Sequence, residues 1–398
     1  MQDFSRQEAA ERAGVDVGEL GRMVELGFIH PGADDRFSSG EIRKAGLVHS
    51  LVESGLPLEG MAAVIAGGGM SLDFMDFPAY ARFTSLSDVT FAQLSERTGV
   101  PVELLMVIRE ATGGAQPDPN DRLTESELDM VPFVELPFRD GFRPIAIERM
   151  LRVQGDSLRR IAEQESDMWR SEVIVPRLAQ GITMDAIAAD EVADRLAPRI
   201  DPALVANYHS HQVREWTRNI IDGIELILAQ SGYQSRLEHP PAMCFLDITG
   251  YTRLTDERGD EAAAALAAEL GRLVQRSSVQ HGGKAVKWLG DGVMFWFRDP
   301  GAGVVAALDM ADGVRGAGLP PAHVGLHAGP VVFQQGDYYG QTVNIASRIA
   351  EYARPGEVLV SQAVVEASEG AGAAFTEIGP VELKGVGGTV HLHAARRG

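Results

Sequence analysis

The sequence has a single cysteine, Cys244, so no disulfide bond can form within the chain. So few cysteines are typical of proteins from a reducing compartment. The first residues lack the basic start and apolar stretch of a secretory signal, and no run of eighteen uncharged apolar residues occurs. These absences predict a cytoplasmic protein without a membrane partner, in which Cys244 is a small buried residue of a strand.

Cations are scarce as well, with 36 lysines and arginines against 56 aspartates and glutamates and a formal net charge of −20. This balance argues against broad attraction to nucleic acid or anionic lipid, because both need a basic face that neutralises phosphate. A nucleotide substrate is compatible with it, since a metal ion and a few local cations can carry the phosphate charge. The length of 398 residues predicts two or three domains.

The N-terminal part contains a degenerate repeat, which divides it into units 1–85 and 86–141. Short helices joined by a glycine turn are typical of helix-turn-helix units, and Ser38 and Thr124 are expected to cap a helix in each copy. The stretch from Gln7 to Arg43 resembles the N-terminal unit of MerR-type regulators. The parallel segments are residues 8–17 with 92–102, and residues 35–42 with 121–128.

That resemblance raises DNA binding as a hypothesis, and charge argues against it. Residues 1–90 hold fourteen Asp and Glu against seven Lys and Arg, a net of −7. The expected recognition helix, Val17 to Glu25, offers only Arg22 to a groove that demands several cations. We therefore expect a re-used structural scaffold without a DNA partner.

Residues 142–233 are expected to form a helical regulatory or transmitting region. Apolar residues recur at helical spacing from Ile145 to Trp169, and a second long helix is expected from Leu204 to Gly232. Val175-Pro176 and the segment ending at Pro202 are expected to break the run. The apolar stripes suit either a transmitting element and dimer contact or a plain helical core.

Strands and helices alternate in residues 234–398. This order predicts an α+β ferredoxin-like domain, with helices packed on one face of an antiparallel sheet. His323 and His327 fall in a strand and are expected to be structural. The expected strands are 243–248, 283–289, 293–297, 323–328, 358–361, 375–378 and 390–393, and the expected helices are 261–280, 304–316 and 341–352.

Three motifs in this region bring metal-binding and polar residues together. Asp247 lies in Phe-Leu-Asp-Ile-Thr-Gly-Tyr-Thr, Asp291 in Lys-Trp-Leu-Gly-Asp-Gly, and a polar set runs from Asp337 to Arg348. Two aspartates and a backbone carbonyl suit two hard divalent cations that activate a hydroxyl and neutralise a leaving group. Gly250 leaves room for backbone amides to approach phosphate oxygens.

In combination these motifs resemble the catalytic domain of the class III nucleotidyl cyclases, over roughly residues 240–395. The resemblance implies a head-to-tail homodimer with two Mg²⁺ or Mn²⁺ ions at each interfacial site. One subunit would bind the metals and the other would read the purine and hold the ribose and α-phosphate. The residues implied are Asp247, Asp291 and the Ile248 carbonyl for the metals, Thr249, Gly250 and Lys384 for phosphates, Lys287 and Asp337 for the purine, and Asn344 and Arg348 for catalysis.

Hydrogen bonding predicts the base, because Lys287 only donates and ionised Asp337 only accepts. Adenine matches this pair and guanine would mismatch it, so we expect an adenylate cyclase that converts ATP to 3′,5′-cyclic AMP and pyrophosphate. The rival hypotheses are a guanylate cyclase, a degenerate inactive copy, and a DNA-binding regulator whose cyclase-like domain senses nucleotide. Residues 155–169 more weakly resemble the regulatory halves of soluble actinobacterial cyclases, which implies an input module for an unnamed small ligand or proton.

Overall fold

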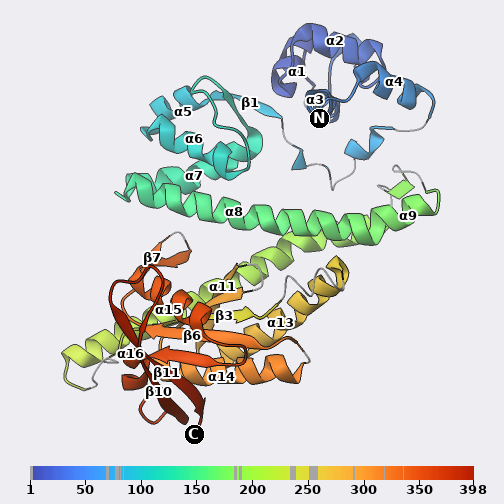
Figure 1. The fold of residues 1–398 in the computed structure, drawn as a ribbon. Helices are drawn as coiled ribbons and strands as arrows, with labels where there is room; N and C mark the ends of the chain where they lie inside the picture. The colour runs from blue at the N-terminus through green and yellow to red at the C-terminus, as the bar shows by residue number, and fades with distance from the viewer. Residues whose placement is uncertain are drawn as a thin grey trace. The chain divides into compact units, whose positions relative to one another are not determined.

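The computed structural model describes residues 3–68, 71–76, 80, 82–83, 85–182, 186–187, 191–233, 239–250, 259–289, 292–317, 319–334 and 336–398. The chain forms two compact units, residues 1–217 and residues 218–398. The first is mainly helical and the second contains a large sheet (Figure 1). Within the described ranges, no helix is long and apolar enough to cross a membrane.

The first unit begins with four helices around a compact apolar core. Ser38 accepts a hydrogen bond from the amide of Glu41 at the start of the third helix, so the predicted cap is confirmed. Leu20, Met23 and Phe37 are fully buried between these helices. The four helices are α1 (Arg6–Ala13), α2 (Val17–Glu25), α3 (Ser39–Glu53) and α4 (Leu58–Ala66).

The next part of this unit combines helices with a small sheet. Thr124 caps its helix through a capping box with Glu127, as expected. Two short antiparallel strands were not expected, because the sequence predicted only helices there. The elements are β1 (Leu86–Thr90), α5 (Phe91–Thr98), α6 (Val102–Ala111), β2 (Arg122–Thr124) and α7 (Glu125–Arg139).

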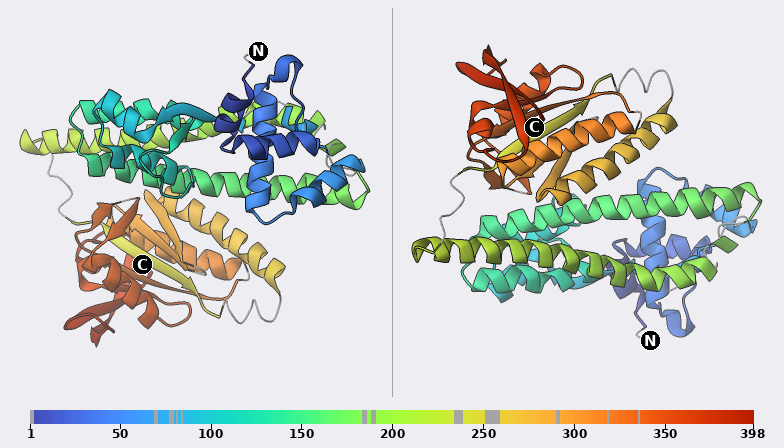
Figure 2. Two further views of the ribbon diagram at one scale, coloured as in Figure 1. Left: turned by 90° about the horizontal axis from the view of Figure 1, so that it is seen from above. Right: turned by 90° about the horizontal axis from the view of Figure 1, so that it is seen from below.

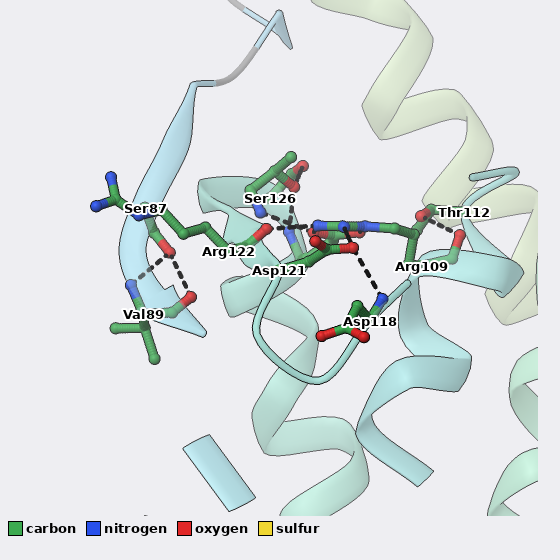
Figure 3. Close-up of polar contacts among 10 residues, drawn as sticks. Ser87, Val89, Arg109, Thr112, Asp118, Asp121, Arg122 and Ser126 are labelled. Atoms are coloured by element: carbon green, nitrogen blue, oxygen red, sulfur yellow. Dashed lines mark hydrogen bonds and ion pairs between the residues drawn. The ribbon is translucent and has the colours of Figure 1, made fainter. Parts of the chain in front are cut away.

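A charge cluster links α6 to the start of α7. Both oxygens of Glu127, which is 4% exposed, accept hydrogen bonds from Arg109 at 2.8 Å. Burial opposes ionisation of Glu127, but the hydrogen bonds from Arg109 and from the Thr124 amide outweigh it, so the pKa of Glu127 is lowered. Figure 3 shows Arg109 beside Asp121, whose carboxylate also accepts from the amide of Asp118.

Long helices complete the first unit and lead into the second. A π-helical turn (Arg170–Ile174) joins α8 (Pro144–Trp169) to α9 (Val175–Ala179), so the chain is irregular near the expected break at Pro176. The second expected break is wrong. Helix α11 (Glu191–Gln230) runs through both Pro198 and Pro202, although each interior proline removes a backbone hydrogen bond and crowds the preceding turn.

The second unit is built on a seven-stranded sheet with the order β10-β11-β9-β6-β3-β5-β4. Its strands are β3 (Ala242–Ile248), β4 (Gly283–Leu289), β5 (Gly292–Phe297), β6 (Ala322–Ala328), β9 (Val358–Ser361), β10 (Ala373–Glu382) and β11 (Thr389–Arg397). The separate hairpin β7 (Val332–Gln334) and β8 (Asp337–Tyr339) was not predicted. The helices are α13 (Asp260–Gln280), α14 (Pro300–Gly316), α15 (Gln341–Tyr352) and α16 (Gln362–Glu366).

The sheet is mixed, so the prediction of a wholly antiparallel sheet is wrong. Strands β6 and β9 pair in parallel, with Val324 opposite Val358, while the other pairs are antiparallel. The chain between these two strands includes α15, and a helical crossover of this kind joins parallel neighbours. The α+β class itself matches the prediction.

Helices cover both faces of the sheet, which corrects the expectation of one covered face. Helices α13 and α14 lie side by side over the face that contains Leu246, Phe295 and Leu326 (Figure 2). Helix α15 packs on the opposite face against β6 and β3. A Cβ atom added to Gly325 would lie 2.1 Å from the backbone nitrogen of Ala350, so this close approach of helix and strand requires glycine.

Candidate active site

Asp247, a predicted metal ligand, lies near the C-terminal end of β3. Leu246 and Ile248 are buried in the core beneath α13 and α14, so the alternation of the strand turns Asp247 to the opposite face. Its side chain is 43% exposed. Oδ1 accepts a hydrogen bond from the amide of Ile248 at 3.1 Å, and Oδ2 lies 3.3 Å from Nε2 of His323. The carboxylate is therefore oriented at both oxygens and still reaches solvent.

Asp291, the second predicted metal ligand, lies outside the described residues. The residue that follows it, Gly292, pairs with Asp247 across β3 and β5. A Cβ atom at Gly292 would lie 3.2 Å from Asp247 Oδ1, so a larger residue would crowd this carboxylate. The hairpin that carries Asp291 in the sequence thus returns to the sheet directly beside Asp247.

Thr249 and Gly250 form the start of the turn after β3. The Thr249 amide donates to the carbonyl of Pro321 at 3.1 Å, and its hydroxyl oxygen lies 3.2 Å from Nδ1 of His323. Gly250 has a φ of +74°, in the left-handed region that favours glycine. The exposed, left-handed turn suits a close approach to phosphate, and the residues that follow, 251–258, lie outside the described part of the chain.

Lys287 and Asp337, predicted to read the purine, are brought together. Lys287 Nζ donates to Asp337 Oδ2 at 2.8 Å, and this hydrogen bond raises the pKa of Lys287. The lysine side chain is 50% exposed and the aspartate 17% exposed. Asp337 Oδ1 also accepts from the amide of Tyr338 at 2.8 Å, so the acceptor is the more firmly held of the two.

A β-bulge decides which face Lys287 occupies. Ala285 pairs with Phe295 and Lys287 with Met294, so Val286 is the extra residue between them. Phe295 belongs to the core beneath α13 and α14, whereas Met294 is buried on the opposite face. Without the bulge, Lys287 would alternate onto the side of Phe295. The bulge puts it on the face of Asp247.

The hairpin that carries Asp337 is attached to the sheet through aromatic rings. The ring of Tyr338 stacks on Trp296 of β5, with 6.0 Å between centroids and 12° between planes. Lys284 Nζ lies 5.2 Å from the Tyr338 ring and 5.1 Å from the ring of Phe333. Since Tyr338 follows Asp337 directly, this packing positions the carboxylate opposite Lys287.

Asn344 and Arg348 lie one turn apart on α15, as the sequence predicts. Asn344 is exposed, and Arg348 forms an ion pair with Glu351 on the same helix at 2.5 Å. Helix α15 begins after Gly340, and the Thr342 hydroxyl donates to the carbonyl of Pro330 at 2.7 Å near its first turn. Lys384, the predicted phosphate contact, is exposed in the turn between β10 and β11.

His323 lies among the candidate site residues, where the sequence did not place it. It was expected to be structural, yet it contacts both Asp247 and Thr249. Local sequence patterns do not reveal this contact, because only the pairing of β3 with β6 places His323 directly across from Asp247. His327, on the same strand, does fit the structural expectation, because its Nδ1 lies 2.8 Å from the Ser361 hydroxyl, away from these residues.

The donor chemistry at the end of β3 fits a hard divalent cation. Asp247 supplies carboxylate oxygen, the backbone of Ile248 supplies carbonyl oxygen, and the close approach of Gly292 leaves the carboxylate uncrowded. Within the described residues, no group of three or more His, Cys, Asp or Glu side chains could hold a metal ion. A complete site would therefore need Asp291 or oxygen atoms from a substrate.

Comparison with known proteins shows a similarity to nucleotide cyclases. Residues 318–394 match the adenylate and guanylate cyclase catalytic domain. The chain is 28% identical over 323 residues to the pH-sensitive adenylate cyclase of Mycobacterium tuberculosis, with 78% of each chain covered. It is 26% identical to the adenylate cyclase of Streptomyces coelicolor, with 69% of this chain and 70% of that protein covered.

Among solved structures, the adenylyl cyclase CyaB from P. aeruginosa aligns with 40% of this chain and 94% of its own, at 22% identity and a TM-score of 0.36. Residues 318–394 are therefore similar to the adenylate and guanylate cyclase catalytic domain, and a larger part of the chain is similar to proteins named adenylate cyclase. The MerR-like character of the N-terminal helices stays a prediction.

Proposed function

We propose that this protein is an adenylate cyclase that converts ATP to 3′,5′-cyclic AMP and pyrophosphate. Relatives named adenylate cyclase and the catalytic-domain match support the enzyme class. The observation that carries the choice of substrate is the pairing of Lys287 with Asp337 on the sheet face that also holds Asp247. A donor beside an acceptor is what the Watson–Crick edge of adenine requires.

The metal-binding residues are Asp247, Asp291 and the carbonyl of Ile248. Two divalent cations bound there would act as Lewis acids on the ribose 3′-hydroxyl and on the phosphate oxygens. The protein's own contribution is to hold the carboxylate in place, through the Ile248 amide at Oδ1 and His323 at Oδ2. Lys384 and the turn after β3 would bind the phosphates, with the lysine acting as a point charge.

Base selection rests on the half-buried acceptor Asp337 and the exposed donor Lys287. Asp337, held by the Tyr338 amide, would accept from the 6-amino group of adenine, and Lys287 would donate to N1. The ion pair between them keeps both groups satisfied until the base arrives. Guanine would leave donor facing donor, and unpaired polar groups reject a wrong substrate strongly.

The active site is completed in a homodimer. Asp247 and Asp291 of one subunit would act with Lys287, Asp337, Asn344 and Arg348 of the other. The exposure of Asn344 and Lys287 supports their reaching a second chain. Asn344 would orient the ribose, and Arg348 would exchange Glu351 for the developing charge at the α-phosphate.

Regulation by the N-terminal region would reach the catalytic unit through the end of α11. Arg298, at the end of β5, forms ion pairs with Asp222 and Glu225 on this helix. The guanidinium of Arg218 lies 5.7 Å from the ring of Trp296, which stacks on Tyr338. A movement of α11 would therefore change the contacts of Tyr338, the residue next to Asp337. The signal itself, a small ligand or a proton, is unidentified.

The first test is chromatographic detection of cyclic nucleotide from the full chain with Mn²⁺ and either ATP or GTP. Cyclic AMP from ATP alone, abolished by Asp291→Ala, is the expected result. Cyclic GMP as the main product would instead establish a guanylate cyclase. A folded protein that makes neither product would exclude the proposed activity under these conditions and favour a nucleotide sensor.

The shared site has its own test. Asp247→Ala and Asn344→Ala proteins should each be inactive, and mixing them should restore part of the activity, because one of the two interfacial sites is then intact. Absence of rescue in a verified mixed dimer would contradict the shared site and leave the reaction itself untouched.

A further inference from the structure

His323 contacts two residues of the proposed site at once. It lies across from Asp247 in the pairing of β3 and β6, with Nε2 3.3 Å from Asp247 Oδ2. Its other ring nitrogen, Nδ1, lies 3.2 Å from the hydroxyl oxygen of Thr249. The histidine side chain is 16% exposed, against 43% for Asp247, so the ring lies beneath the carboxylate and not in front of it.

Hydrogen-bond chemistry gives this contact a direction. Asp247 Oδ2 lies 3.3 Å from Nε2, and because an ionised carboxylate only accepts, a hydrogen on Nε2 is the arrangement that favours this contact. With the hydrogen on Nε2, Nδ1 can accept a hydrogen bond from the Thr249 hydroxyl, whose oxygen lies 3.2 Å away. The lone pairs of the Thr249 hydroxyl then point away from the ring. The other oxygen of Asp247, Oδ1, accepts from the Ile248 amide and lies beside Gly292.

We propose that His323 is a positioning residue that orients the Asp247 carboxylate and the Thr249 hydroxyl for binding of a divalent cation together with nucleotide phosphate. The inference rests on the proposed function, since it assigns a metal to Asp247. Loss of a residue that orients a metal ligand commonly lowers metal affinity about 10- to 100-fold, and we expect an effect of about that size for His323. His323 acts through Asp247 and Thr249 and does not itself touch substrate.

The alternative is that His323 has only a structural role in the sheet, as His327 has. His327 is on the same strand and the same face, and its ring binds the Ser361 hydroxyl instead of a site residue. It is therefore a matched control: replacing it disturbs the same strand without touching Asp247 or Thr249. A loss of metal affinity caused by general loosening of β6 would follow both replacements.

Two polar substitutions distinguish the contact of His323 with Asp247 from its contact with Thr249. The amide nitrogen of glutamine falls near the position of Nε2, so His323→Gln can still donate to Asp247. The amide of asparagine falls near Nδ1, so His323→Asn can reach Thr249 but not Asp247. Both variants keep a polar side chain in the half-buried position, and thermal unfolding of each would verify that the sheet is intact.

The experiment measures binding of Mn²⁺ to the full chain, from the electron paramagnetic resonance signal of the free ion, in the presence of 3′-deoxy-ATP, which cannot cyclise. We expect His323→Asn to weaken Mn²⁺ binding about 10- to 100-fold, and His323→Gln and the control His327→Gln to stay within about threefold of the parent. Equal affinity in His323→Asn and the parent, or an equal loss in His327→Gln, would overturn the inference.

The same titration keeps this inference distinct from the proposed function. If the parent chain binds Mn²⁺ with the analogue and cyclises ATP, while His323→Asn binds the ion as tightly, only the role of His323 fails. If the parent chain binds no Mn²⁺ with the analogue and makes no cyclic nucleotide, the proposed function fails and the role of His323 fails with it.

Discussion

Lys287 and Asp337, fifty residues apart in the sequence, form an ion pair of 2.8 Å between β4 and β8. Reversing their hydrogen-bonding character should reverse the choice of base. With Lys287→Glu and Asp337→Ser combined, an acceptor faces N1–H of guanine and a donor faces its O6. Each mismatch with adenine should cost about 10- to 100-fold, from roughly 1–3 kcal/mol for an unpaired buried group.

The measurement is kcat/KM for ATP and for GTP in the parent and the double variant. Lys287→Ala is the control, since it should lose activity with ATP without gaining activity with GTP. An unchanged ratio of the two values in the double variant would show that these residues do not read the base.

The Arg109–Glu127 pair should stabilise the first unit. Arg109→Met leaves Glu127 buried without its bidentate partner, which should cost about 3–5 kcal/mol of local stability. Hydrogen exchange of α5 to α7 in the full chain measures this loss. The control Arg159→Met removes an exposed pair with Glu163 and should change exchange very little.

The lowered pKa of Glu127 also makes the stability of the first unit depend on pH. A carboxyl group whose folded pKa lies below its ordinary value of 4.5 contributes stability that is present above that value and lost as the pH falls below it. The protection factors of α5 to α7, corrected for the intrinsic pH dependence of amide exchange, should therefore fall on acidification in the parent chain. Arg109→Met should show a weaker dependence, and an identical dependence would contradict the role of this pair.

His327 should make the second unit less stable in mild acid. Burial lowers its pKa from 6.5 to about 4, so the folded chain keeps it neutral while the unfolded chain takes up a proton. Its contribution to the free energy of unfolding is complete above pH 6.5. As the pH falls to about 4, the protein loses up to about 3 kcal/mol of this stability. As the pH is lowered from 6.5 to 4, the midpoint temperature of thermal unfolding should fall more steeply in the parent than in His327→Gln. Parallel curves would refute this assignment.

Cys244 should resist thiol reagents in the folded protein. It is fully buried in β3, and burial raises the pKa of its thiol, so little thiolate forms at neutral pH. A chromogenic disulfide should release no colour from the native chain and one equivalent after denaturation. Since the sequence has one cysteine, the signal reports this strand alone, and fast reaction of the native protein would show that β3 opens readily.

Local patterns in the sequence predicted most elements of the second unit and the identity of the candidate residues. The order of strand-like and helical segments along residues 234–398 predicted β3, β5, α13 and α15. These succeed because a strand or a helix is decided largely by its own residues. The cap at Ser38 is confirmed for the same reason.

The tertiary structure alone decided how those elements meet. The parallel pairing of β6 with β9, the bulge at Val286 and the contact of His323 with Asp247 depend on strand register, which joins residues far apart in the chain. A shift of one residue would turn every side chain of a strand to the other face. The sequence therefore indicated the candidate residue types, whereas the face of the sheet on which each side chain lies, and its neighbours there, were decided by how the strands pair and pack.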